Sequence, residues 1–521
     1  MSAQGPASAP SDPAAVYGAV AVPVRHPALC SAAVILATML YSIDWTIAAV
    51  ALPHMRGTFS ATQDQISWVI TSYIVASAVM IPTAGFLSAR FGRKRVFVAS
   101  VAGFVGASVL CGSADSLAME VFARIVQGMS GAFLVPLSQA IVLDTYPPEK
   151  HTRMMAYWGV GSVFGPVVGP TLGGYLTEYF DWRWIFFINV PVGLIALAGV
   201  LAFLTESRRE PEKRLDFFGF LTLALGVGAL QMMLDRGESH GWFDSAEIAI
   251  EAALAALGLY LFAAHSLTTR NPFLDPRLLA VRGFALGLAI VFLYGMLTVP
   301  PMVLMPPFMQ DLRGMPVDTI GLLQSPRGAG LVVAMFAGGS FTHVLGPRAL
   351  IGFGFACLAL SAAEMSTWNL DVGTWPIVWT GFVQGVGAGV IWVPLQSVVF
   401  PSLAVAQRTE AAAVLNLVRS VGSSIGVSVA LTALTRSATT ARAHLVEHVT
   451  PYHEVFRYAD VARHWDLTTL TGLARIQREI ELQAAMIGYA ADFRLLAIGA
   501  LAALPLLVLI RRPQGPAHSR A

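Results

Sequence analysis

Charged side chains are scarce in this sequence. Only 12% of its 521 residues are Asp, Glu, Lys or Arg, whereas 55% are hydrophobic, and an ordinary soluble chain carries roughly 25% charged residues. So few charges cannot cover the apolar surface of a water-soluble fold. A bilayer accommodates such a chain, because an apolar run of about 20 residues crosses the hydrocarbon as a helix that satisfies its own backbone. The composition therefore predicts an all-α integral membrane protein.

Cysteine and the common catalytic motifs are also missing or rare. Cys30, Cys111 and Cys357 lie far apart in apolar segments, so we interpret them as buried apolar side chains. There is no HExxH, GxSxG or Walker A sequence and no His cluster with metal spacing, which argues against a membrane-embedded enzyme, an ATP-driven pump, a metal or another cofactor. The net charge of +2 and the lack of a basic cluster interleaved with aromatics argue against nucleic acid as a partner.

Fourteen apolar runs are long enough to cross a membrane. They are 29–52, 66–88, 96–113, 117–142, 155–178, 184–204, 217–234, 246–266, 283–305, 319–342, 349–367, 375–399, 410–434 and 488–510. Residues 1–26 are rich in Ala, Pro and Ser, and the first run exceeds the apolar core of a signal peptide. We therefore predict a disordered cytoplasmic tail followed by an uncleaved first helix.

The basic residues of the short loops predict the orientation, since Lys and Arg accumulate on the cytoplasmic side. One side has Arg90, Arg93, Lys94, Arg95, Lys150, Arg153, Arg208, Arg209, Lys213, Arg214, Arg270, Arg277, Arg282, Arg511 and Arg512. The other side has mainly isolated Arg56, Arg183, Arg236 and Arg313. We expect a multi-pass protein of the cell inner membrane with both termini in the cytoplasm.

An internal repeat predicts two related halves. The segment 125–142 (IVQGMSGAFLVPLSQAIV) resembles 382–399 (FVQGVGAGVIWVPLQSVV) with a one-residue shift, and these are the fourth and twelfth runs. Repeated halves around a central site are typical of secondary transporters. The predicted division is a six-helix half at 27–204, two intervening helices at 205–270, a six-helix half at 271–511 and a cytoplasmic tail at 512–521.

The long connection 435–487 falls on the periplasmic side in this arrangement. Leu473, Ile476, Ile480, Ala484 and Ile487 recur at helical spacing, which predicts an amphipathic helix. Two interpretations remain open: a surface-lying or helix-extending cap, and a docking surface for a partner protein.

The fifth run carries glycine at every fourth position: Gly161, Gly165, Gly169 and Gly173. A bare strip of this kind lets a neighbouring backbone approach closely. Pro166 and Pro170 each remove an amide donor and make the helix easier to bend. Ordinary small-residue packing would explain the glycines, but the doubled Gly-Pro repeat favours a gating helix.

Further motifs support a family resemblance. Gly85 and Gly92 permit a tight turn in GFLSARFGRKRV, which Arg90 and Arg93 anchor; this loop resembles the signature loop of the major facilitator superfamily, with Ala89 in place of its usual acidic residue. The other segments are IDWTIAAVALP (43–53), ARIVQG (123–128), the Gly-Pro helix (161–174), WRWIFFINVPVG (182–193) and LQMMLDRGESHGWF (230–243). Together they resemble the fourteen-helix drug:proton antiporters, the EmrB/QacA branch, although Ala49 stands where the family commonly has Asn.

The resemblance implies the major facilitator fold and export of amphipathic toxic compounds against inward proton flow. It also implies a periplasmic membrane-fusion adaptor and an outer-membrane channel as partners, beside the small-molecule drugs, protons and lipid bilayer. A proton-coupled symporter or a narrow-specificity exporter of the same fold is the alternative. The doubled Gly-Pro helix, which the resemblance associates with antiporters, argues against symport.

Asp44 and Arg124 are candidate proton-coupling residues, because intramembrane charge is costly and usually functional. Asp44 lies roughly 22 Å along the first helix from its cytoplasmic start, and Arg124 lies roughly 11 Å along the fourth from its outer start. In a core about 30 Å thick the two reach similar depth. Pairing with Arg124 would favour the charged carboxylate, whereas desolvation disfavours it. A static buried ion pair is the alternative, and the family resemblance lends both positions the coupling role.

The substrate cavity has its own candidates: Trp45, Gln127, Arg327, Gln384, Asn416 and Arg419. If Arg327 and Arg419 face the cavity, its field is positive and favours lipophilic acids and neutral compounds over dications. The alternatives are that both arginines bond to backbone carbonyls and that the amides join neighbouring helices.

Overall fold

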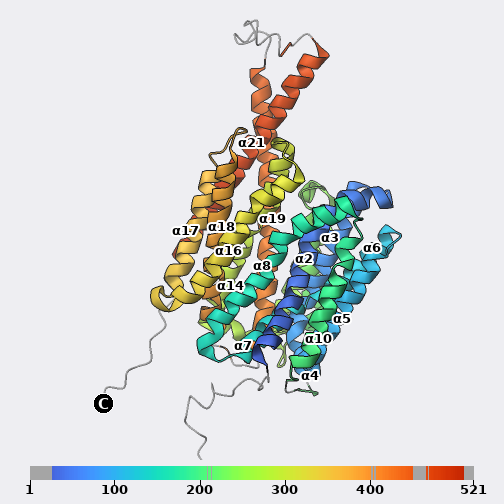
Figure 1. The fold of residues 1–521 in the computed structure, drawn as a ribbon, viewed down its shortest axis with the longest axis vertical. Helices are drawn as coiled ribbons and strands as arrows, with labels where there is room; N and C mark the ends of the chain where they lie inside the picture. Colours follow the sequence, from blue (N-terminus) through green and yellow to red (C-terminus); the bar gives the residue numbers. More distant parts are fainter. Residues whose placement is uncertain are drawn as a thin grey trace, which may run out of the picture.

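In the part of the chain that the structure describes, the polypeptide makes fourteen helical passages that run roughly along the long axis of the molecule (Figure 1). The computed structural model describes residues 26–207, 209–212, 214–400, 403, 407–449, 465–466 and 469–509, and every regular element in these ranges is a helix. Within them, thirteen helical stretches have the length and apolarity of a membrane span. The remaining long helix, α8 (Pro148–Tyr179), is richer in Gly and Pro and packs against α2 and α16. The fourteen predicted runs each correspond to one of these passages.

The first six passages coincide with the runs predicted up to residue 204. They are α2 (Pro27–Phe59); α3 (Gln63–Met80), which continues through a 3-10 turn (Ile81–Thr83) into α4 (Ala84–Phe91); α5 (Arg93–Gly112); α6 (Leu117–Gly131) with α7 (Leu134–Thr145); α8; and α9 (Trp184–Phe187) with α10 (Asn189–Phe203).

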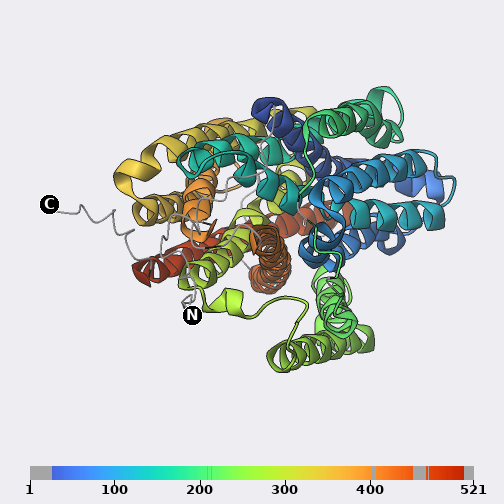
Figure 2. The ribbon, with the colours of Figure 1, turned by 90° about the horizontal axis from the view of Figure 1, so that it is seen from below.

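The next two passages lie at the edge of the bundle. They are α11 (Phe217–Arg236) and α12 (Ala246–Thr268), joined through a 3-10 turn (Trp242–Asp244) and drawn in green in Figure 2. α11 packs against α3 and α19, whereas the main neighbour of α12 is α11. A Cβ added at Gly258 would lie only 2.7 Å from the Gly226 Cα, so two glycines allow this close crossing.

The last six passages form the other side of the molecule. They are α14 (Arg282–Thr298), preceded by the short α13 (Arg277–Ala280) and continued by α15 (Pro300–Pro307) and a π-helical turn (Phe308–Leu312); α16 (Val317–Leu345); α17 (Pro347–Met365); α18 (Thr374–Val399); α19 (Arg408–His448); and α21 (Leu470–Ala503) with a final 3-10 turn (Leu504–Leu509).

Local sequence explains where several helices begin. The Thr62 side chain accepts a hydrogen bond from the backbone N–H of Gln65, and the Gln65 side chain accepts one from the backbone N–H of Thr62, which is a capping box. Ser116 caps α6 through the Met119 amide. Gly92 separates α4 from α5 at φ +95°, a conformation that glycine adopts without strain.

The predicted periplasmic connection is largely helical. α19 and α21 continue beyond the bundle as an antiparallel pair (Figure 1), and Arg442 lies 3.7 Å from Glu481 between them. Ile476 and Ala484, from the predicted amphipathic pattern, are buried. The connection therefore extends these two helices, and its use as a docking surface for a partner protein stays a prediction. Residues 450–464 of this connection, and the tails predicted at 1–26 and 512–521 except for His26, lie outside the described residues.

Candidate functional site

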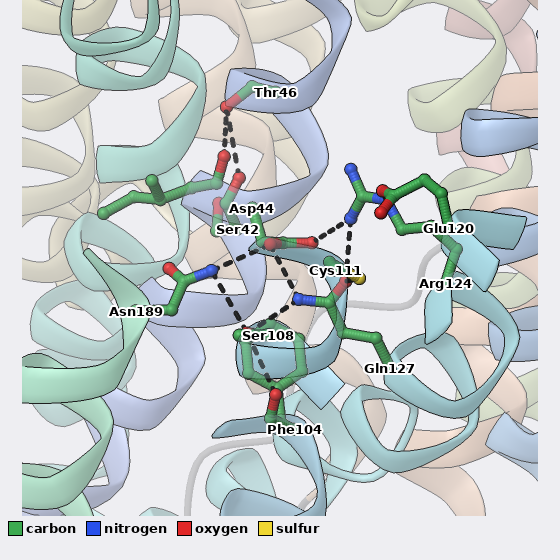
Figure 3. A network of polar contacts seen from close by, with 11 residues as sticks. Ser42, Asp44, Thr46, Phe104, Ser108, Cys111, Glu120, Arg124, Gln127 and Asn189 are labelled. Carbon is green, nitrogen blue, oxygen red and sulfur yellow. Dashed lines mark hydrogen bonds and ion pairs between the residues drawn. The ribbon is translucent and has the colours of Figure 1, made fainter. Parts of the chain in front are cut away.

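A buried ion pair joins α2 to α6. Arg124 Nη1 donates to Asp44 Oδ2 at 2.7 Å, and the two residues are 1% and 0% exposed. The depth estimate from the sequence permitted this contact. Figure 3 shows the pair surrounded by polar side chains from α5, α6 and α10.

Two amides complete the environment of the Asp44 carboxylate. Gln127 Nε2 and Asn189 Nδ2 both donate to Asp44 Oδ1, at 2.9 and 2.8 Å. Gln127 also accepts from Arg124 at 2.8 Å and donates to Ser108 at 2.8 Å. A buried charge is tolerated when it is paired and hydrogen-bonded in this way. Gln127, a predicted residue of the substrate cavity, therefore bonds to both partners of the ion pair.

A second carboxylate approaches the same guanidinium. Glu120 Oε1 lies 3.6 Å from Arg124 Nε, Glu120 is 0% exposed, and neither of its oxygens has a hydrogen-bond partner among the described residues. Glu120 and Asn189 are absent from the residues predicted from the sequence. The i,i+4 spacing from Glu120 to Arg124 was a usable signal, and so was the position of Asn189, an amide in an apolar run within the segment WRWIFFINVPVG.

The glycine strip of α8 lies directly against the turn of α2 that carries Asp44. A Cβ at Gly165 would collide with the backbone of Ser42 and Ile43, and one at Gly169 with the Thr46 hydroxyl. The first and last glycines of the strip also leave no room for a side chain, because a Cβ at Gly161 would meet Ile35 and one at Gly173 would meet Ile47. Pro166 and Pro170 continue the helix within α8. This strip therefore ties α8 to the segment that holds the coupling candidate.

Polar and aromatic side chains meet where the two sides of the molecule join. Gln139 on α7 donates to Gln396 on α18 at 2.7 Å and accepts from Asn416 on α19 at 3.2 Å. The ring of Trp158 on α8 stacks on Trp392 of α18, with centroids 6.2 Å apart. Gln139 and Gln396 belong to the two copies of the internal repeat, so the repeats contact each other.

The other cavity candidates are dispersed. Arg327 donates to the Thr298 carbonyl on α14. This contact agrees with the alternative in which the arginine bonds to a backbone carbonyl. The Arg419 side chain is half-buried and has no hydrogen-bond or ion-pair partner in the described part of the chain. Gln384 is buried in α18. For Trp45, the side chain lies outside what the structure describes.

A predominantly apolar cleft of about 490 Å³ lies between α8 and α16. It is lined by Val160, Val163, Val168, Ser325, Gly328, Ala329, Val332 and Val333. These residues occupy the middle of both helices, at the depth where hydrocarbon would surround the protein.

The signature loop is held by charges from both sides of the molecule. Arg93 pairs with Asp144 at the end of α7, and Asp144 Oδ1 lies 2.8 Å from Arg408 Nη1 at the start of α19. The Ala89 carbonyl accepts from the Glu210 amide at 2.8 Å, and Arg90 lies over the Phe86 and Phe91 rings. A Cβ at Gly85 would lie 3.1 Å from the Glu410 Cα. A charge cluster thus forms here although position 89 lacks an acid.

Comparison with known proteins identifies the family. Residues 34–427 match the Major Facilitator Superfamily. The chain belongs to this superfamily. This major facilitator is 35% identical to multidrug export protein EmrB of Escherichia coli (strain K12) over 423 residues, which cover 80% of this chain and 82% of that protein. It is 32% identical to EmrB of Haemophilus influenzae over 94% of this chain and 97% of that protein, which places it in the EmrB-type family.

A third relative and two solved structures extend the comparison. Fatty acid resistance protein FarB of Neisseria gonorrhoeae is 35% identical, over 80% of this chain and 82% of that protein. The human organic anion transporter MFSD10 shares the fold with a TM-score of 0.62 at 16% identity, covering 92% of this chain and 99% of that one. The proton:xylose symporter XylE has a TM-score of 0.59 at 13% identity, covering 92% and 96%. This major facilitator is a multi-pass membrane transport protein.

Proposed function

We propose that this transporter exports amphipathic toxic compounds, lipophilic acids among them, in exchange for protons. Two of its relatives are named for multidrug export and one for fatty acid resistance, and the named activities agree with an exporter of this kind. A narrow-specificity exporter or a proton-coupled symporter of the same fold remains the alternative.

The observation that carries the proposal is the Asp44 network. Asp44 is fully buried, its charge is balanced by one guanidinium, and it belongs to the turn of α2 whose neighbouring residues Ser42, Ile43 and Thr46 contact α8. Because α8 also contacts α16 and α18 of the opposite side, a change in the charge of Asp44 acts on the turn of α2 that packs against the helix connecting the two sides. Proton binding and substrate binding are coupled when each favours a different arrangement of the same helices.

Two features support lipophilic acids as substrates. The cleft between α8 and α16 offers an apolar wall for a hydrocarbon group. Arg419 supplies a half-buried positive charge on α19. An anionic head group and an apolar tail would each have a chemical counterpart in one of these two features.

We place the transporter in the cell inner membrane with both termini in the cytoplasm, since the basic loops cluster at one end of the sequence-predicted topology. The α19–α21 pair then projects into the periplasm. Its length beyond the bundle (Figure 1) suits contact with a periplasmic adaptor that leads to an outer-membrane channel.

Proton movement in proteoliposomes tests the function. Wild type and Asp44→Asn are reconstituted, a pH gradient is imposed, and proton flux is followed after addition of decanoate as a lipophilic acid or rhodamine 6G as a lipophilic cation. We expect substrate-dependent proton flux opposite to the substrate in wild type. Asp44→Asn should abolish this flux yet still bind the substrate, because the amide replaces the carboxylate through which the exchange is coupled to substrate.

Three results would contradict parts of the proposal. Substrate and proton moving in the same direction would establish symport. Normal coupling in Asp44→Asn would remove Asp44 from the mechanism. Dications as the best substrates would refute the preference for acids.

A further inference from the structure

The Asp44 network contains one more acid than base. Asp44 and Glu120 lie on opposite sides of a single guanidinium, Arg124, at 2.7 and 3.6 Å. Figure 3 shows Glu120 beside Arg124, away from Asp44 and its amide donors. All three residues are at most 1% exposed. If both acids were ionised, the group would carry one uncompensated negative charge in a site closed to water, which is strongly unfavourable.

Among the residues that the structure describes, no group lies within hydrogen-bond distance of the Glu120 carboxylate to compensate its charge. The groups that face this cluster are Tyr73 on α3, Cys111 on α5, Asp44 on α2 and Arg124 on its own helix, with the more distant Arg183 before α9. Arg183 is turned toward the Ala114 carbonyl and Asp181. The two acids also differ: Asp44 accepts three hydrogen bonds, whereas Glu120 accepts none among the described residues.

We propose that Glu120 is a second proton-binding residue of the network and that it competes with Asp44 for Arg124. The inference rests on the proposed proton-coupled export and deepens it. One proton makes the three residues electrically neutral, and it can occupy either acid. On Glu120, it forms an O–H bond at a carboxyl oxygen and leaves Asp44 paired with the guanidinium, as the hydrogen bonds favour.

The second arrangement follows when the proton is on Asp44 instead. Glu120 is then ionised and attracts Arg124 Nε, which has no hydrogen-bond partner in the described structure, while protonated Asp44 releases Nη1. Glu120 lies in the first turn of α6, one turn closer than Arg124 to the end that we expect to face the periplasm. A proton from periplasmic water would therefore bind Glu120 first and make the three residues neutral. Its transfer to Asp44 would then leave their total charge unchanged.

Infrared spectroscopy of the reconstituted full-length protein tests this directly, because a protonated carboxylic acid has a carbonyl stretching band that a carboxylate lacks. All variants are made in an Asp492→Asn background, since Asp492 on α21 is also buried without a hydrogen-bond partner among the described residues and would contribute a band. We expect Glu120→Gln to lose the buried acid band. Asp44→Asn should lose it too, because the remaining acid can then ionise against Arg124.

Two outcomes would overturn the proposal. A band that persists in Glu120→Gln assigns the proton elsewhere. A band that is lost in Glu120→Gln but persists in Asp44→Asn makes Glu120 a permanently neutral acid that does not compete for Arg124. Glu178→Gln is the matched control, because Glu178 is exposed near the same end of the bundle, and it should leave the band unchanged.

A conservative variant keeps the test decisive if Glu120→Gln does not fold. Glu120→Asp retains a carboxyl group in altered surroundings, so the band should remain and shift in frequency; an unshifted band would refute the assignment. The spectra need no substrate. A failure of proton-coupled export in proteoliposomes would therefore remove the proposed function without changing the band assignment, and the two failures are distinguishable.

Discussion

At the scale of single residues, a charged side chain is buried in this protein where other groups pair with it or hydrogen-bond to it. Asp44 is tolerated in the interior because a guanidinium and two amides face it. Removing one partner of a buried ion pair costs about 3–5 kcal/mol, because the other charge is left uncompensated. Neutral replacement of the acid also leaves Arg124 beside Glu120, so the Asp44→Asn variant retains an alternative partner for that base.

His151 provides a titrating residue outside the membrane-spanning part of α8. Burial is the main reason why the pKa of His151 is lowered; the Tyr146 carbonyl beside Nε2 opposes this effect and Arg408 adds to it. The unfolded chain therefore binds a proton at a higher pH than the folded protein does. The contribution of His151 to the free energy of unfolding should be fully present above about pH 6.5, which is the pKa of histidine in the unfolded chain. It should be lost as the pH drops from there toward the lower pKa of His151 in the folded protein.

Thermal unfolding in detergent on either side of about pH 6.5 checks this expectation. His151→Gln should reduce the loss of Tm on acidification, because the amide cannot be charged. His54→Gln is the control, since His54 is exposed. An equal acid-induced loss of Tm in wild type and His151→Gln would contradict the assignment.

The sequence predicted part of the site and missed part of it. Depth along two helices was sufficient to permit the Asp44–Arg124 contact, since helix rise is regular. It could not select Asn189, because the rotation of α10 about its axis depends on packing rather than on the local sequence. Arg327 and Arg419 look alike in sequence, yet one donates to a carbonyl and the other has no partner in the described residues. Whether these residues bind substrate stays a prediction.

At the scale of helices, the fourteen passages follow from apolar length, which the sequence displays directly. The amphipathic spacing at 473–487 predicted a helix where α21 extends beyond the bundle. The continuation of α19 to His448 was not predicted, because charged residues there lower the hydropathy without preventing a helix. Arg442 and Glu481 are about half exposed, as expected for a helix pair in water. The partner-docking role of this pair remains untested.

The glycine strip of α8 gives a prediction at the same scale. In Gly165→Ala the new methyl group meets the backbone of Ser42 and Ile43, which cannot move aside as a side chain can. α8 must separate from α2, and overpacking of this kind costs about 1–3 kcal/mol. We expect a lower Tm and impaired transport of decanoate in proteoliposomes. In Gly57→Ala, where nothing lies within 4 Å of the added Cβ, the Tm and the transport rate should both stay at the wild-type level. Wild-type values for Gly165→Ala would show that the close approach of α8 to α2 is not needed.

At the scale of the whole molecule, the two repeats contact each other at the end where the basic loops gather. Asp144 links the signature loop to the start of α19 through Arg93 and Arg408. One turn or more deeper, Gln139 joins Gln396 and Asn416. Rocking of one side against the other, the movement typical of such repeats, would have to break both sets of contacts: a charged layer around Asp144 and an amide layer around Gln139. The charged layer is the weaker one, because its side chains are 11–16% exposed.

Loss of the Asp144 charge should therefore favour opening at this end. Each partly exposed ion pair contributes up to about 1 kcal/mol, so Asp144→Asn should raise the open population on the order of 5- to 30-fold. A cysteine introduced by Asn416→Cys, at a position 3% exposed, would then react correspondingly faster with a maleimide, after subtraction of labelling at the three native cysteines. Arg442→Gln breaks an ion pair of the α19–α21 extension instead and should not change the labelling rate. If Asp144→Asn labels no faster than Arg442→Gln, the charged layer does not hold the two sides together, and the Gln139 layer alone must resist their separation.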